Sequence, residues 1–182
     1  MEDFSYIKSN LAAVQEEIEM LSQRHGILTP TLACVTKSAT DEELLALVRY
    51  GASDVAENRP QELTRRAALL KSNGLSVNYH QIGHLQSNKA AKVTALSPLI
   101  HSLGSESLLC ELERIGERDG IESRVLIEVN SAEEEKKSGI SFSGYSMEKP
   151  FAWGADFTSL EAVLTSMMEL SADSVAAMCV DG

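Results

Sequence analysis

The chain has 182 residues, which is enough for one sizeable core and short for two domains. Hydrophobic residues make up 43% of the sequence and charged residues 24%, an ordinary globular composition that excludes disordered and low-complexity classes. The formal net charge of −11 argues against a nucleic-acid partner, because binding to phosphate backbones needs a basic surface, although a few local donors suffice for one phosphate in a pocket.

Membrane and redox signals are weak along the whole sequence. No stretch approaches the roughly 18 apolar residues that a membrane helix needs, and the acidic N-terminus differs from the basic start of a signal peptide. We therefore expect a cytoplasmic protein with no membrane partner. Cys34, Cys110 and Cys179 are far apart and have no CxxC spacing, so we expect reduced, mostly buried thiols rather than a disulfide frame or a zinc site.

The hydrophobic pattern predicts alternating helices and strands in the first 130 residues. Apolar residues three and four apart predict a first helix from Ile7 to Leu21 that stops at Gly26. A capping-box pattern at Thr40–Glu43 and a proline at position 60 mark the next two helix starts. Two further helices are expected over residues 88–96 and 108–115, and strands over residues 31–36, 53–56, 77–82, 99–103 and 124–129.

Successive strand–helix units predict a parallel sheet, because each crossover must return to the same edge. An open doubly wound sheet and a closed (β/α)8 barrel both satisfy this pattern. The segment Lys37–Thr40 after the first strand lacks the glycine-rich fingerprint of dinucleotide-binding sheets. Polar residues instead follow several strands, where barrel enzymes collect their site residues: Lys37, Glu57–Asn58, Gly83–His84 and Asn130. We predict an α/β protein with a TIM barrel as one domain over residues 1–182.

The predicted barrel is incomplete at its C-terminal end, since a complete one takes about 250 residues. Regular alternation stops beyond Gly139. Residues 141–157, which contain Trp153, are expected to form a loop, and residues 160–168 are expected to form an amphipathic helix.

Lys37 is the first candidate for chemistry, because it directly follows an apolar strand. Apolar walls disfavour the charged form of an amine, and the neutral amine is the nucleophile that forms a Schiff base. A solvated lysine just past a strand is the plainer interpretation. Asn58 suits either a helix N-cap or a donor and acceptor beside a planar ligand.

The segment Tyr79–Lys89 is the most distinctive in the chain. A helix opened by Ser87 or Asn88 would present backbone N–H groups to an anion. His80 and His84 have the i,i+4 spacing of a metal pair, but that spacing brings ligands together only on a helix, so we expect no metal site.

Taken in order, several segments resemble the pyridoxal phosphate homeostasis protein family, which is similar in fold to the N-terminal barrel of alanine racemase. The segments are Leu32–Lys37, Glu57–Glu62, Tyr79–Lys89, Ile100–Ser102 and Val129–Gly139. The match covers residues 1–139, and Gln81 replaces the aromatic or apolar residue usual in the family.

The resemblance implies that Lys37 is the Schiff-base lysine for pyridoxal 5′-phosphate (PLP) and that Asn58 lies beside the cofactor ring. Family members are regarded as PLP carriers or regulators without turnover of their own. No obvious second acid–base residue is present, so we expect no catalytic residues. The implied partners are PLP and PLP-dependent apo-enzymes, and the implied state is a monomer.

Residues 140–182 depart from the family pattern. The family continues into segments that contact the cofactor phosphate, whereas here Ser171 is followed at once by Ala172. Ser171 is the residue that the resemblance aligns with a phosphate contact. Either segments of a longer chain are missing here or the protein is genuinely shortened. We favour the first explanation, because an unclosed parallel barrel exposes two strand edges.

Two alternatives to a carrier stay open. A racemase-like or decarboxylase-like enzyme on the same scaffold would turn over an amino acid. A degenerate barrel used as an interaction module would bind no cofactor, and its acidic surface and the loop around Trp153 would be the places to look for partners.

Overall fold

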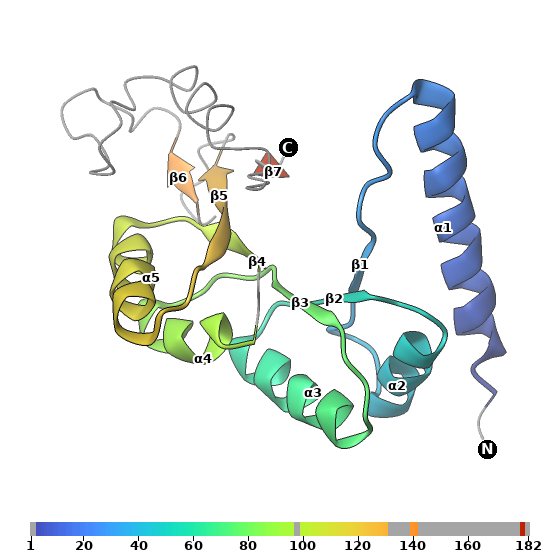
Figure 1. The fold of residues 1–182 in the computed structure, drawn as a ribbon, viewed down its shortest axis with the longest axis horizontal. Helices are drawn as coiled ribbons and strands as arrows, with labels where there is room; N and C mark the ends of the chain where they lie inside the picture. The colour runs from blue at the N-terminus through green and yellow to red at the C-terminus, as the bar shows by residue number, and fades with distance from the viewer. Residues whose placement is uncertain (1–2, 97–98, 131–138, 142–178, 181–182) are drawn as a thin grey trace. The chain divides into compact units, whose positions relative to one another are not determined.

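The structure, a computed structural model, describes residues 3–96, 99–130, 139–141 and 179–180 (Figure 1). The chain consists of two compact units, Met1–Gln81 and Ile82–Gly182. None of the helices within the described ranges is long and apolar enough to cross a membrane.

The helices of the first unit are α1 (Ser5–His25), α2 (Asp41–Arg49) and α3 (Pro60–Ser72). Each begins or ends where the sequence predicts. The α1 helix stops at Gly26, whose φ of 62° is the left-handed conformation that glycine adopts without strain. The α2 helix opens with a capping box between Thr40 and Glu43, and α3 has Pro60 in its first turn.

The strands of the first unit are β1 (Ala33–Val35), β2 (Asp54–Glu57) and β3 (Asn78–Gln81). They pair in parallel, with Val35 beside Ala56 and Ala56 beside His80. Their carboxyl ends therefore lie at one edge of the sheet, where the candidate residues Lys37 and Asn58 follow β1 and β2.

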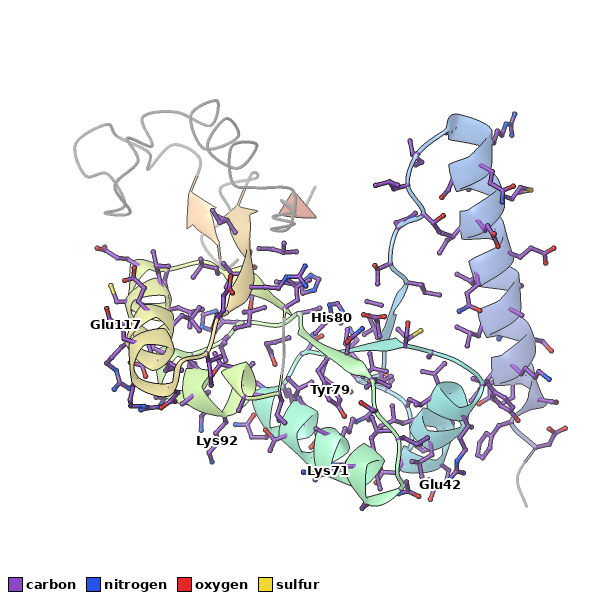
Figure 2. All side chains as sticks on the ribbon, viewed as in Figure 1. Glu42, Lys71, Tyr79, His80, Lys92 and Glu117 are labelled. Atoms are coloured by element: carbon purple, nitrogen blue, oxygen red, sulfur yellow. The ribbon has the colours of Figure 1, made fainter. Side chains whose placement is uncertain are left out.

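The core of the first unit lies between its strands and α2 and α3, which cover one side of the strands in Figure 1. It is built on Leu44, Val55 and Leu70, none of them more than 2% exposed, with Tyr79 packed against them. Figure 2 shows Tyr79 and His80 on opposite sides of β3, as the alternation of side chains along a strand requires.

The second unit repeats the strand–helix alternation. A 3-10 turn (η1, Ser87–Lys89) leads into α4 (Ala90–Thr94), followed by β4 (Leu99–Leu103), α5 (Glu106–Asp119) and β5 (Arg124–Asn130). The strands β4 and β5 pair in parallel, and β5 also pairs in parallel with β6 (Ile140–Ser141) and β7 (Cys179–Val180). Its core residues include Leu108, Leu112 and Ile115 from the inner face of α5.

The structure confirms the predicted elements up to residue 130, with some changes at their ends. Residues 31, 32 and 36 lie outside β1, which is shorter than predicted. The helix predicted over residues 88–96 is split into η1 and the short α4. Serine and asparagine, the residue types at positions 87 and 88, favour helix starts over helix interiors. The loop and helix predicted over residues 141–157 and 160–168 lie outside the described residues, except for Ser141 in β6.

Candidate functional site

The candidate site lies at the carboxyl edge of β1 and β2, both in the first unit. The backbone N–H of Thr36 donates to the carbonyl of Ala56 at 3.0 Å, which extends the pairing of the two strands by one residue. The Thr36 hydroxyl then donates to Oε1 of Glu57 at 2.7 Å. Lys37 and Asn58 each directly follow one member of this hydrogen-bonded pair.

Lys37 occupies a tight turn at the end of β1. The N–H of Ala39 donates to the carbonyl of Thr36 at 2.9 Å, which makes Lys37 and Ser38 the central residues of a four-residue turn. The Lys37 side chain is exposed. The backbone of this lysine is thus set by the turn, while its amine is open to a ligand from solvent.

A buried charged cluster holds this turn. Arg66 of α3 donates from Nη1 to the carbonyl of Thr36 and from Nη2 to the carbonyl of Ala39, both at 2.7 Å. The same Nη1 lies 3.1 Å from Oε1 of Glu57. Arg66 is 5% exposed and Glu57 2%. Burying an ion pair costs less when its other donors and acceptors are also bonded. The two backbone carbonyls accept from Nη1 and Nη2, whereas Nε of Arg66 is buried without a hydrogen-bond partner among the described residues.

Asn58 is held from the neighbouring strand. Its side chain does not cap α3. The N-cap residue of α3 is Arg59, and no side chain forms a capping hydrogen bond at that helix start. The backbone carbonyl of Asn58 accepts a hydrogen bond at 2.8 Å from the side-chain amide of Gln81, which is fully buried. The Asn58 side chain is exposed. The N-cap interpretation of Asn58 is therefore wrong, and the ligand interpretation stays a prediction.

A second polar group lies on the face of the sheet opposite to α3. Nε2 of His80 is 2.9 Å from Oδ1 of Asp54, and Asn78 donates to the same oxygen at 3.1 Å. Ser53 donates to Oδ2 at 2.6 Å. Burial raises the pKa of Asp54, but the hydrogen bonds from Ser53, His80 and Asn78 outweigh it, so the pKa lies below its ordinary value.

Cys34 lies in β1, on the strand that leads to Lys37. Burial, and then the negative charge of Asp54, raise the pKa of its thiol. A raised pKa keeps the thiol protonated and makes it a poor nucleophile. Cys34 and Cys110 are free thiols, as the sequence predicts, but Cys34 is half-buried and Cys110 is exposed, so the expectation of buried side chains is wrong for these two. The side chain of Cys179 is outside the described part of the chain. No group of three or more metal-binding side chains gathers among the described residues.

The other predicted site residues either lie outside the described residues or have other contacts. Ser171 lies outside the described residues, as does the side chain of Asn130. Ser87 and Asn88 open only a 3-10 turn and a short helix, so the predicted anion-binding helix start has little dipole behind it. His80 is engaged with Asp54.

Sequence reasoning missed the cluster of Thr36, Glu57 and Arg66, although one signal was present. Arg66 lies three residues after Leu63 and four before Leu70, on the buried stripe of α3. A charged residue at such a position needs a buried partner of opposite charge. From the sequence, the candidates for this partner are acidic residues at strand ends, such as Glu57.

The fold and the site together define a class: an α/β protein with a parallel sheet and a lysine in a turn at a strand's carboxyl end. Comparison with known proteins is consistent with this class. No family model matches the chain. PipY of Synechococcus elongatus, solved without PLP, superimposes with a TM-score of 0.57 at 27% identity, covering 70% of this chain and 60% of PipY. A protein from Bifidobacterium adolescentis gives 0.64 at 29% identity, covering 79% and 63%.

Curated relatives carry the name pyridoxal phosphate homeostasis protein. The Helicobacter pylori protein is 33% identical over 126 residues, 69% of this chain and 55% of that protein. The Aquifex aeolicus protein is 33% identical over 132 residues, 71% and 57% respectively. The chain is therefore a homologue of the pyridoxal phosphate homeostasis proteins, and it spans about half the length of these curated relatives. The expected family resemblance and the expected fold class are confirmed.

Proposed function

We propose that the protein binds PLP through Lys37 and takes part in PLP homeostasis as a carrier. The main supporting observation is that Lys37 has an exposed side chain on a backbone held by several hydrogen bonds. Lys37 lies in a closed turn whose two end carbonyls are bonded to one buried guanidinium. An accessible amine on an ordered backbone suits covalent capture of an aldehyde, because the neutral amine is the nucleophile that attacks the carbonyl.

The residues at this edge fit the cofactor. Glu57 and Thr36 face Arg66 of α3, and side chains alternate along a strand. Lys37 lies in the turn after β1 and Asn58 just past β2, and both residues are exposed at the carboxyl ends of these strands. Lys37 would hold the cofactor by its amine, and the Asn58 amide can donate to or accept from a planar ring. PLP supplies an aldehyde that condenses reversibly with amines.

The relatives support the same proposal. The H. pylori and A. aeolicus proteins are named for PLP homeostasis, and PipY has also been solved with PLP bound. Their names denote a homeostasis role rather than a reaction, which favours a carrier without turnover. Release to PLP-dependent apo-enzymes, a monomeric state, a single domain and a cytoplasmic location belong to this proposal. Ser171 stays a predicted phosphate contact.

The test is a titration of the purified protein with PLP, followed by absorbance. We expect wild type to give a band at longer wavelength than free PLP and Lys37→Ala to lack it. Lys71→Ala is the matched control, because Lys71 is an exposed lysine in the last turn of α3 (Figure 2). Borohydride reduction and peptide mapping should then find the cofactor on residue 37.

The outcomes of this titration distinguish the carrier from the alternative functions. A band that survives in Lys37→Ala and is lost in another lysine variant would move the attachment point and overturn the assignment. A protein that gives no band in any form would not be a carrier, and an interaction module would become the leading function. Amino-acid turnover that is lost in Lys37→Ala, detected by chiral analysis of a broad panel, would replace the carrier with a racemase-like enzyme.

A further inference from the structure

We propose that Arg66 is a positioning residue that sets the location of the Lys37 amine by clamping both ends of the turn that carries it. This inference rests on the proposed function of Lys37. It assigns to a buried side chain of α3 the control of how well the site captures PLP.

The geometry of the clamp is specific. The two terminal nitrogens of the Arg66 guanidinium donate to the carbonyls of Thr36 and Ala39, each at 2.7 Å. These two residues are the first and last of the turn, with Lys37 directly after the first. A single planar group with diverging donors can bridge two carbonyls in this way, whereas an ammonium ion is a point donor.

The clamp is itself held in place. Glu57 accepts from the Thr36 hydroxyl at 2.7 Å and lies 3.1 Å from Nη1 of Arg66. Thr36 directly precedes Lys37, and Glu57 directly precedes Asn58, so this carboxylate links the two strand ends that carry the candidate ligand residues. Replacement of a buried ion pair by apolar groups is often neutral for folding, so stability alone is a weak explanation of this cluster. Its contacts with the turn point to a role in geometry.

The neighbouring arginine offers a matched control. Arg65 is one residue away on α3 and bonds through both terminal nitrogens to Asp41 at 2.8 Å, but its side chain is 46% exposed. It contacts no residue of the Lys37 turn through these bonds. Arg65→Met and Arg66→Met therefore remove the same group from adjacent positions, and only the second removes the clamp.

The experiment compares PLP capture in these variants under conditions in which each is folded. We expect Arg66→Met to weaken the apparent affinity for PLP about tenfold or more, as misplacement of a reacting group does. Arg65→Met should stay within about twofold of wild type, as expected for an exposed pair. Arg66→Lys should fall between, because it restores the charge but not the fork. Labelling of Lys71, mapped after borohydride reduction, should be equal in all variants, because the reactivity of an exposed lysine outside the turn does not depend on the clamp.

A second measurement does not depend on PLP. Amide hydrogen exchange at Ala39, whose N–H closes the turn, should speed up in Arg66→Met and be unchanged in Arg65→Met. If Arg66→Met does not fold, the double variant Glu57→Met/Arg66→Met replaces it, because no buried charge is then left unpaired.

The outcomes separate the two proposals. A folded Arg66 variant with wild-type PLP affinity and wild-type exchange at Ala39 would overturn the clamp while leaving Lys37 as the attachment point. Absence of PLP binding in wild type would overturn the proposed function, and faster exchange at Ala39 in Arg66→Met would still show that Arg66 orders the turn.

Discussion

At the scale of single residues, Asp54 shows how hydrogen bonds stabilise a buried carboxylate in its charged form. The residue is 6% exposed. Its carboxylate accepts hydrogen bonds from Ser53 and Asn78 and lies beside His80. Hydrogen bonds to the ionised form stabilise it and offset the cost of burial. The result is a pKa below the ordinary value, which links this group to folding.

Because the pKa of Asp54 is lower in the folded chain than in the unfolded one, its contribution to stability is present above the unfolded pKa, about pH 4. It is lost as pH falls through the folded pKa. We expect Asp54→Asn to lower the free energy of unfolding by about 1–3 kcal/mol at neutral pH and to flatten its decline in acid. Urea unfolding between pH 7 and acid checks this, with Glu16→Gln on the exposed surface of α1 as the control.

At the scale of elements, local sequence signals set most helix ends. In α2 the Thr40 hydroxyl accepts from the Glu43 N–H at 3.2 Å, and the Glu43 carboxylate accepts from the Thr40 N–H at 2.7 Å. Such caps act within four residues and so can be predicted without a fold. The cap prediction for Asn58 is wrong although the residue type suits a cap, because Pro60 opens α3 and places Arg59 at the N-cap position.

Removal of the cap should weaken α2. Thr40→Ala should lower the free energy of unfolding by about 1 kcal/mol, because the Glu43 N–H at the helix start loses the Thr40 hydroxyl as its acceptor. Thr64→Ala is the matched control: Thr64 lies inside α3, is exposed, and donates its hydroxyl to the carbonyl of Pro60. Alanine is the better helix former there, so this variant should be neutral or slightly more stable by thermal unfolding. Equal losses in both variants would contradict the assignment of the cap.

At the scale of the whole molecule, each unit has a core of its own, built from strands and the helices that cover them. An apolar residue type alone does not tell which side chains are buried in these cores. Leu70 is fully buried between α3 and the strands. Leu28, equally apolar, follows α1 and is 94% exposed.

This contrast can be tested with the same substitution at both positions. Leu70→Ala should lower the free energy of unfolding by about 2–5 kcal/mol, because it removes buried surface and leaves a cavity. Leu28→Ala should change it by no more than about 0.5 kcal/mol. Urea denaturation of both variants measures the difference, and a large loss in Leu28→Ala would show that this side chain is covered in solution.

The sequence by itself determined the order and kind of the elements up to residue 130, since helix stripes, caps and short apolar strands are set by neighbours a few residues apart. It also placed Lys37 and Asn58 at the ends of adjacent strands. Only the tertiary structure decided what holds them. The bonds from Thr36 to Glu57 and from Arg66 to Thr36 join residues 21 and 30 positions apart. Contacts at such separations depend on strand register and on which face α3 turns to the sheet, and no local pattern encodes either.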